Sequence, residues 1–245
     1  MKTLGVDLAS DPARTGLAVI RWTPGAAHVE ALAVGADDDA IVARRAECET
    51  VGIDAPFGWP LAFAALVAAH ARPGAPDPGP WTAERRAALR YRRTDHVARA
   101  ITGRWPLSPS SDLVAVPMFR CLGLLARLGV TDRGAGPVFE TYPALALKRW
   151  GLADVGYKGR DRQARLGALA DALFAAAPWL RLDPAAAALA RTVDDAFDAL
   201  VAALVARAAA CDLVTAPTAA EREDAAAEGW IVIPDPDALD HMASS

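Results

Sequence analysis

The sequence contains little cysteine. Cys48, Cys121 and Cys211 are the three cysteines among 245 residues. Their number is odd and their spacing is too wide for a zinc motif, so the sequence indicates neither a disulfide framework nor a cysteine-based metal site. We interpret them as buried thiols of a protein in a reducing compartment.

Long apolar runs are also lacking. The alanine-rich stretches LAFAALVAAHA and DALVAALVARAAAC are too short, or too charged at their margins, to cross a bilayer. The first residues, MKTLGVDLAS, begin a strand-like pattern at once and leave no room for a secretion signal. We therefore expect a cytoplasmic protein with no membrane partner. The sequence does not indicate an oligomeric state.

The chain has no excess of positive charge. Its formal net charge is -4 and its pI is about 5.6. Binding to nucleic acid regardless of sequence depends mainly on Lys and Arg contacts to phosphates, so this composition argues against it. Local basic patches do occur, in RRAALRYRRTDHVAR at 85–99 and between 148 and 165. A solvated helix face explains either patch equally well.

The pattern that is present alternates strands and helices. Hydrophobic residues make up 53% of the chain and charged residues 23%, as in ordinary globular proteins. Strand-like segments lie at 3–9, 16–22, 28–34, 50–56 and 137–143. A helical segment at 37–47 separates the third strand from the fourth, which predicts that the fourth strand is parallel to the first. The prediction is an α/β fold with a mixed five-stranded sheet flanked by helices.

The segment at about 60–136 differs from the rest. It has helical patterns separated by loops rich in proline and glycine at 72–80 and 102–112. We expect a helical insertion between strands four and five, within a single domain of residues 1–245. Further elements are predicted at about 143–150, 160–177 and 184–210 as helices, and at 229–234 as an edge strand.

The last long helix is apolar on two faces. A core-facing stripe consists of Phe197, Leu200, Val201, Leu204 and Val205. The opposite face carries small residues, Ala199, Ala202, Ala203 and Ala206, so it could lie close against a neighbouring element.

Carboxylates recur at the ends of these elements. Asp7 lies between Val6 and Leu8, where an ionised group needs a partner. Asp54 ends the fourth strand. Adjacent parallel strands end at one edge of a sheet, so these two acids can converge there. Further acids lie on the fifth strand, Glu140, and on the last helix, Asp195 and Asp198.

Several carboxylates in one place raise one another's pKa unless a cation compensates them. Mg²⁺ and Mn²⁺ prefer oxygen ligands, and two such ions about 3.5–4 Å apart can clamp the attacking and leaving oxygens of a phosphodiester. Each acid also has a purely structural interpretation: a turn cap for Asp7, an Asx-turn before Pro56 for Asp54, and a helix cap for Asp194 or Asp195.

The motifs GVDLA, GIDAP, YRRTD, ETYPA, GYKG and DDAFDALVAA, in this order, resemble those of an uncharacterised family of predicted nucleases with the ribonuclease H-like fold. The chain is also remotely similar to the Holliday-junction resolvases of that fold. The resemblance spans about residues 3–234. It implies a two-metal site of Mg²⁺ or Mn²⁺ held by Asp7, Asp54, Asp195 and Asp198.

The resemblance also implies roles for residues outside this set of four. Glu140 would be catalytic, and the substrate-binding candidates are Arg93, Asp95, Tyr157 and Lys158. Lys158 could contact a phosphate or stabilise charge in the transition state. Arg93 could hold a phosphate or pair with Asp95. Helical geometry leaves Asp194 as a rival of Asp195 for the metal.

Three functions compete. The first is a metal-dependent hydrolase of phosphodiester bonds, nuclease-like, acting on nucleic acid or on a nucleotide-like phosphate ester. The net acidity argues against a long nucleic acid. The second is a nucleotide-binding phosphotransferase of the actin and sugar-kinase class, because GVDLASDPARTGLAVI also resembles the first phosphate-binding hairpin of that class. The third is a non-catalytic scaffold of the same fold.

Overall fold

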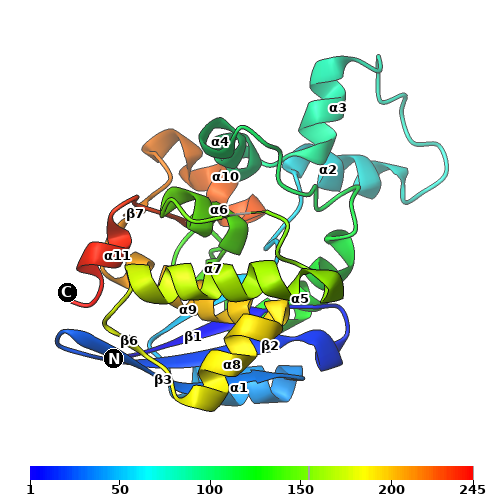
Figure 1. The fold of residues 1–245 in the computed structure, drawn as a ribbon. Helices are drawn as coiled ribbons and strands as arrows, with labels where there is room; N and C mark the ends of the chain where they lie inside the picture. The colour runs from blue at the N-terminus through cyan, green and yellow to red at the C-terminus, as the bar shows by residue number, and fades with distance from the viewer. Residues whose placement is uncertain (154, 245) are drawn as a thin grey trace.

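A mixed six-stranded sheet forms the centre of the protein (Figure 1). The structure is a computed structural model, and it describes residues 1–153 and 155–244. The strands lie in the order β5-β4-β1-β2-β3-β6. Their bounds are β1 Lys2–Asp7, β2 Gly16–Thr23, β3 Ala26–Val34, β4 Thr50–Asp54, β5 Val138–Glu140 and β6 Leu180–Arg181.

The directions of the strands match the sequence pattern. β1, β2 and β3 form an antiparallel meander, whereas β4 pairs parallel with β1, and β5 pairs parallel with β4. The predicted α/β class and the parallel pairing of strands one and four are confirmed. The sheet has one strand more than the five that the sequence predicts. The additional strand is β6, which pairs with β3 through only two residues. A strand of that length is too short to show an alternating pattern.

Helices flank the sheet. Their bounds are α1 Asp38–Arg45, α2 Leu61–His70, α3 Ala83–Arg90, α4 Arg93–Thr102, α5 Ala115–Arg127, α6 Pro143–Arg149, α7 Gln163–Ala176, α8 Pro184–Thr192, α9 Asp194–Ala210, α10 Arg222–Glu228 and α11 Ala238–His241. Short 3-10 helices are η1 Pro12–Arg14, η2 Arg160–Arg162 and η3 Ala219–Glu221. Among the described residues, no helix combines the length and apolar character needed to cross a bilayer.

The predicted strand at 229–234 forms only in part. β8 (Ile233–Pro234) pairs with β7 (Val214–Thr215) in a separate two-stranded sheet. Ile231 makes one parallel bridge to Glu140 at the edge of the main sheet. The apolar pattern of this segment therefore reflects burial more than regular strand pairing. The buried residues are Trp230, Ile231, Val232 and Ile233.

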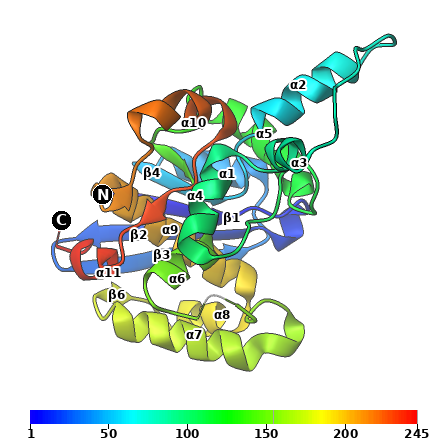
Figure 2. The ribbon, with the colours of Figure 1, turned by 90° about the horizontal axis from the view of Figure 1, so that it is seen from above.

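The sheet is covered on both faces (Figure 2). On one face, side chains such as Ile20 and Trp22 pack against α7 and α9. On the other, Val6 and Ile53 pack with Ile41 of α1 and Leu124 of α5. The predicted thiols are free: Cys48 and Cys121 are buried, and Cys211 is half-buried.

Four helices, α2 to α5, lie between β4 and β5, in the part of the chain where helices were predicted. α2 and the loop that follows it project away from the sheet in both ribbon views (Figures 1 and 2). α2 contains no buried residue, although its sequence is almost entirely apolar.

The predicted helix at 184–210 is two helices. α8 ends at Thr192 and α9 begins at Asp194, because Val193 between them is extended, with φ -127° and ψ 112°. The break turns the chain and places the first turn of α9, with its aspartates, at one edge of the sheet. β-branched residues such as Thr192 and Val193 are compatible with an extended backbone, but they do not demand one.

α9 lies unusually close to the sheet. A Cβ atom on Gly5 would be 2.0 Å from the carbonyl oxygen of Ala199, and one on Gly52 would be 2.3 Å from that of Ala202. Glycines on β1 and β4 and small residues on α9 therefore permit backbone contact. This confirms the sequence expectation that the alanine face of the last helix packs closely, and it brings that helix to the ends of β1 and β4.

Candidate functional site

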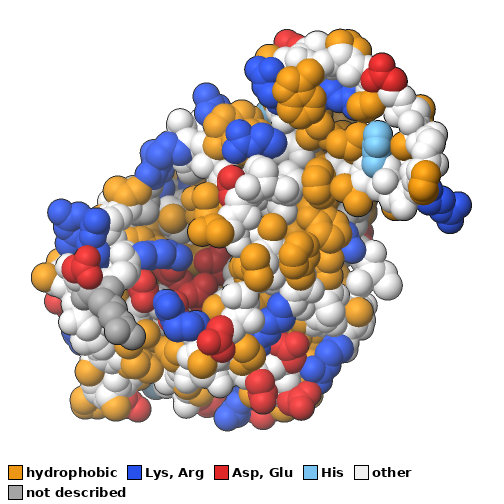
Figure 3. Space-filling view, turned by 90° about the vertical axis from the view of Figure 1, so that its right-hand side faces the viewer, with side chains coloured by type: hydrophobic (Ala, Val, Ile, Leu, Met, Phe, Trp, Pro, Cys, Tyr) orange, Lys and Arg blue, Asp and Glu red, His pale blue; other side chains and the backbone are white. Residues whose placement is uncertain are grey.

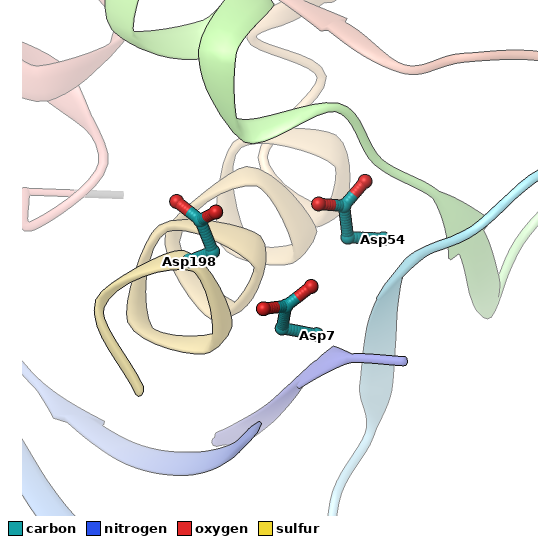
Figure 4. A group of neighbouring side chains, drawn as sticks. All are labelled: Asp7, Asp54 and Asp198. Atoms are coloured by element: carbon teal, nitrogen blue, oxygen red, sulfur yellow. The ribbon is translucent and has the colours of Figure 1, made fainter. Parts of the chain in front are cut away.

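Three aspartates meet at the edge of the sheet. Asp7 and Asp54 are register partners at the ends of the parallel strands β1 and β4, after the similar segments Gly5-Val6 and Gly52-Ile53. Asp198 reaches them from the second turn of α9. One carboxylate oxygen from each lies within 4.8 Å of the others, and Figure 4 shows the three side chains side by side. We call Asp7, Asp54 and Asp198 the acidic trio.

Asp198 is fully buried. Its Oδ1 atom accepts a hydrogen bond of 2.9 Å from the hydroxyl of Tyr157. Its Oδ2 atom has no hydrogen-bond partner of regular geometry among the described residues, but it lies 2.5 Å from Nζ of Lys158 in an ion pair. The ammonium group of Lys158 therefore compensates the charge on Oδ2.

The surroundings disfavour negative charge on the acidic trio. Burial, and secondarily the charge of Asp198, raises the pKa of Asp54 to about 7, although Lys158 opposes the shift. Burial also raises the pKa of Asp7 well above its usual range, and Asp198 and Asp54 add to this effect. The pKa of Asp198 is raised by burial as well. Three such carboxylates are stabilised by protons or by added positive charge.

Lys158 provides part of that positive charge. Although 55% of its side-chain surface is exposed, its ammonium end lies against the trio. Burial lowers its pKa, but the negative charges of Asp198, Asp54 and Asp7 outweigh burial and hold the pKa well above its usual range. The ammonium group therefore stays charged and occupies the place where a cation would be attracted.

The structure does not bring Asp195 into the acidic trio. Its carboxylate accepts two hydrogen bonds from Arg14, at 2.8 Å from Nε and 3.0 Å from Nη2. Asp194, the rival candidate, accepts a hydrogen bond of 2.8 Å from the backbone of Gly159. Positions 195 and 198 are neighbours on α9, but the carboxylate of Asp195 is held by Arg14 and that of Asp198 by Tyr157 and Lys158. Of the four predicted metal ligands, three converge.

Glu140 and Asp95 are also occupied elsewhere. Both bind Arg92, which is buried to 1% exposure. Arg92 donates to the two oxygens of Glu140 at 2.8 and 2.7 Å and to Asp95 at 3.0 Å. Glu140 also accepts from the backbone of Phe57 at 2.9 Å. Glu140 therefore lies behind the acidic trio as part of a buried ion network.

The sequence analysis names Arg93 as a substrate-binding candidate and does not single out the neighbouring Arg92. Arg93 is 53% exposed, and it pairs at 2.8 Å with Glu221 and not with Asp95. The sequence does contain one sign that Arg92 and Asp95 are close. Arg92 immediately precedes α4, and the side chain of an acid three residues later can accept a hydrogen bond from the backbone N–H at the start of a helix. In a segment so rich in arginine, that signal does not reveal which arginine is buried.

A pocket of about 590 Å³ opens beside the acidic trio. Figure 3 shows acidic side chains at the base of a hollow with basic and apolar side chains at its margin. The inner end is lined by Asp7, Asp54, Tyr157 and Lys158, and the outer end by Leu107, Leu113 and Val155. Arg93 is not among the lining residues. Asp7 and Asp54 therefore border a space that a small molecule could enter, whereas Asp198 is buried and is not among the lining residues.

These features define a class of protein: an α/β protein with a cluster of carboxylates where two parallel strands end and a helix crosses them. Residues 5–222 match the family described as Protein of unknown function (DUF429), and the chain belongs to this family. No curated protein and no solved structure matches the chain. The expectation of an uncharacterised family is confirmed. The match covers all of the acidic trio and Lys158, but assigns no activity to them.

Proposed function

We propose that the protein is a metal-dependent hydrolase of phosphodiester bonds with a ribonuclease H-like fold. The observation that carries the proposal is the convergence of Asp7, Asp54 and Asp198 within 4.8 Å. The meander of β1 to β3, the parallel strand β4 and the acid-bearing helix α9 support the fold assignment, because the resemblance implies acids on the first strand, the fourth strand and the last helix.

The residues fit Mg²⁺ or Mn²⁺. The trio supplies only carboxylate oxygens, which these ions prefer. The Oδ2 atom of Asp198 is buried and faces a cation already, the ammonium group of Lys158, so its surroundings suit positive charge. Asp7, Asp54 and Asp198 would hold one ion. A second ion would draw on Asp195 after its release from Arg14.

The side chains around the trio have separable roles. Tyr157 donates to Oδ1 of Asp198 and orients that carboxylate. Lys158 must withdraw from Oδ2 when a cation takes its place, which frees its ammonium group to face a substrate phosphate. A divalent ion, when bound, supplies positive charge that stabilises the charge developing on a phosphate in the transition state. Lys158 would add to that stabilisation.

Calorimetric titration with Mn²⁺ tests the proposal. We expect the parent protein to bind Mn²⁺ and the variants Asp7→Asn and Asp198→Asn to bind it at least tenfold more weakly. Asp171→Asn is the matched control, because Asp171 pairs with Arg191 at the surface, away from the trio. A parent protein that binds neither Mn²⁺ nor Mg²⁺ would favour the scaffold interpretation instead.

The phosphotransferase alternative makes a different prediction. It requires a nucleotide to bind at the connection between β1 and β2, where Arg14 already pairs with Asp195. A titration with ATP and Mg²⁺ that gave saturable binding, weakened by Arg14→Met but not by Asp54→Asn, would support this alternative over the hydrolase.

A further inference from the structure

The pocket beside the acidic trio has two unlike ends. The inner end carries the carboxylates and Lys158. The outer end presents Leu107, Leu113 and Val155, which are 61%, 87% and 57% exposed. Large apolar side chains at the mouth of a site are a common means of holding the organic part of a small ligand.

Leu107 and Leu113 stand on a well-braced loop. The hydroxyl of Ser108 donates to the carbonyl of Arg90 at 2.7 Å, and that of Ser110 donates to the carbonyl of Leu89 at 2.7 Å. The backbone of Ser108 also donates to Asp112 at 2.7 Å. These bonds tie the loop to the end of α3. The exposure of the two leucines is therefore a property of an ordered loop.

The charge of the pocket does not suit a polynucleotide. Such a ligand is held by a series of Lys and Arg contacts to successive phosphates. Of the described residues that line the pocket, only Arg92 and Lys158 are basic. Arg92 is engaged by Glu140 and Asp95, so Lys158, once a metal ion replaces it at Asp198, is the basic lining residue that can reach a phosphate inside the pocket. One ammonium group beside a metal site suits a ligand with a single phosphate group better than a polynucleotide with many.

We propose that the substrate is a small phosphodiester with one apolar or aromatic substituent, which lies against Leu107, Leu113 and Val155 while its phosphate lies at the acidic trio. This inference rests on the proposed function. The volume of about 590 Å³ is in the range of small-molecule sites, roughly 300–1,000 Å³. The net charge of -4 is consistent with a substrate that carries few phosphates.

The reaction is a balanced hydrolysis. The oxygen of water forms a bond to phosphorus, and the bond from phosphorus to the oxygen of the leaving group breaks. One proton of the water ends on the leaving oxygen, which departs as an alcohol or phenol. The other proton stays with the phosphate monoester or passes to solvent. No oxidant, reductant or further reactant is consumed.

Steady-state kinetics with Mn²⁺ and methyl 4-nitrophenyl phosphate test the inference. We expect Leu113→Gln and Val155→Asn to raise KM about tenfold with kcat changed less than twofold, because each removes apolar contact with the substituent and not with the phosphate. Val67→Asn is the matched control, because Val67 is a valine of similar exposure, 51%, on α2 outside the pocket lining. It should leave both constants unchanged.

A 12-nucleotide single strand is the competing ligand in the same assay. We expect that the protein does not cleave the oligonucleotide. We also expect no inhibition by the oligonucleotide at concentrations at which the small diester saturates the enzyme. Cleavage of the oligonucleotide with a KM unaffected by Leu113→Gln and Val155→Asn would overturn the inference and leave the proposed hydrolase intact. Hydrolysis of neither compound by the Mn²⁺-loaded protein would overturn the proposed function and the inference with it.

Discussion

At the scale of single residues, the acidic trio is the feature from which the chemistry follows. Asp7 and Asp54 can be placed together from the sequence alone, because each ends a strand with the pattern Gly-x-Asp and adjacent parallel strands end at one edge. Asp198 follows from the helix motif. Asp195 could not be separated from Asp198 in this way, because the direction of each side chain depends on how α9 is rotated against the sheet.

Burial is the property of single residues that the sequence concealed. Arg92 and Arg93 are adjacent in a segment rich in arginine, yet Arg92 is 1% exposed and Arg93 has an exposed side chain. The difference arises from Glu140 on a distant strand, whose carboxylate binds Arg92. Such pairing depends on the tertiary fold, which no local charge pattern reveals.

The raised pKa of Asp54 predicts a pH dependence of stability. Its folded pKa of about 7 exceeds the ordinary value of 3.8, so the folded state holds this proton more tightly than the unfolded state. The contribution of Asp54 to the free energy of unfolding is therefore greatest below about pH 4 and is lost as the pH rises through 7. Asp54→Asn, which does not titrate, should stabilise the metal-free protein on the order of 2 kcal/mol at pH 8.

Urea unfolding in the presence of a chelator measures this effect. The advantage of Asp54→Asn over the parent should grow between pH 5 and pH 8. Addition of Mn²⁺ at pH 8 should stabilise the parent but not the variant. An advantage that stayed constant or shrank with rising pH would contradict the raised pKa.

Lys158 is predicted to compete with a metal ion for the trio. Lys158→Met removes the ammonium group that lies 2.5 Å from Asp198. We expect Mn²⁺ to bind about tenfold more tightly to the variant, because the ion no longer displaces a resident cation. At the same time kcat for a phosphodiester should fall about a hundredfold, as when a group that stabilises the transition state is lost.

The opposite directions of the two effects make the test specific. Calorimetry gives the affinity and steady-state kinetics give kcat. Lys2→Met serves as control, because Lys2 pairs with Glu30, a residue outside the acidic trio, and both side chains are partly exposed. Weaker Mn²⁺ binding to Lys158→Met would show that the lysine supports the metal site instead of competing for it.

At the scale of secondary structure elements, the contact between α9 and the sheet decides whether a site exists. The sequence indicated this contact through the alanine face of the helix, and Gly5 and Gly52 complete it from the sheet. The division of the predicted helix 184–210 at Val193 was not indicated, since neither proline nor glycine marks it. α8 packs on α7 and β3, whereas α9 packs mainly on β1, β2 and β4, so the chain turns between the two helices.

Gly52→Ala should therefore damage both stability and metal binding. Its Cβ atom would lie 2.3 Å from the carbonyl oxygen of Ala202, so α9 must move away from β4. We expect a loss of about 3 kcal/mol or more in the free energy of unfolding, at the upper end of overpacking costs. Displacement of α9 should also weaken Mn²⁺ binding, because Asp198 moves with the helix.

Gly123→Ala is the control for this prediction. Gly123 lies in α5, and a Cβ atom there would meet nothing within 4 Å, so the substitution should stabilise the protein by about 0.5–1 kcal/mol. Urea unfolding measures both variants. Equal stabilities for Gly52→Ala and the parent would contradict the close packing of α9 on the sheet.

At the scale of the whole molecule, the sequence predicted the α/β class and the location of the helices between β4 and β5. The sixth strand and the small second sheet, each pairing through two residues, fell below the length at which strand patterns can be recognised. Arg92 joins several of these parts. It contacts Asp95 of α4, Glu140 of β5 and the carbonyl of Glu228 at the end of α10.

Arg92→Met should consequently destabilise the whole fold. It leaves two buried carboxylates without their cation, and breaking a buried ion network in this way costs about 3–5 kcal/mol. Arg93→Met should cost less than about 1 kcal/mol, because the ion pair of Arg93 is exposed on one side. Chemical denaturation compares the two variants. Similar losses for both would contradict the structural importance of the Arg92 network.

The central claim is that Asp7, Asp54 and Asp198 share a divalent cation. The most direct measurement is the anomalous scattering of Mn²⁺ in crystals of the protein soaked with MnCl₂. We expect a peak of anomalous density among the three carboxylates, with the ammonium group of Lys158 displaced from Asp198. Crystals in which Mn²⁺ bound only elsewhere, while Lys158 kept its contact with Asp198, would contradict the claim.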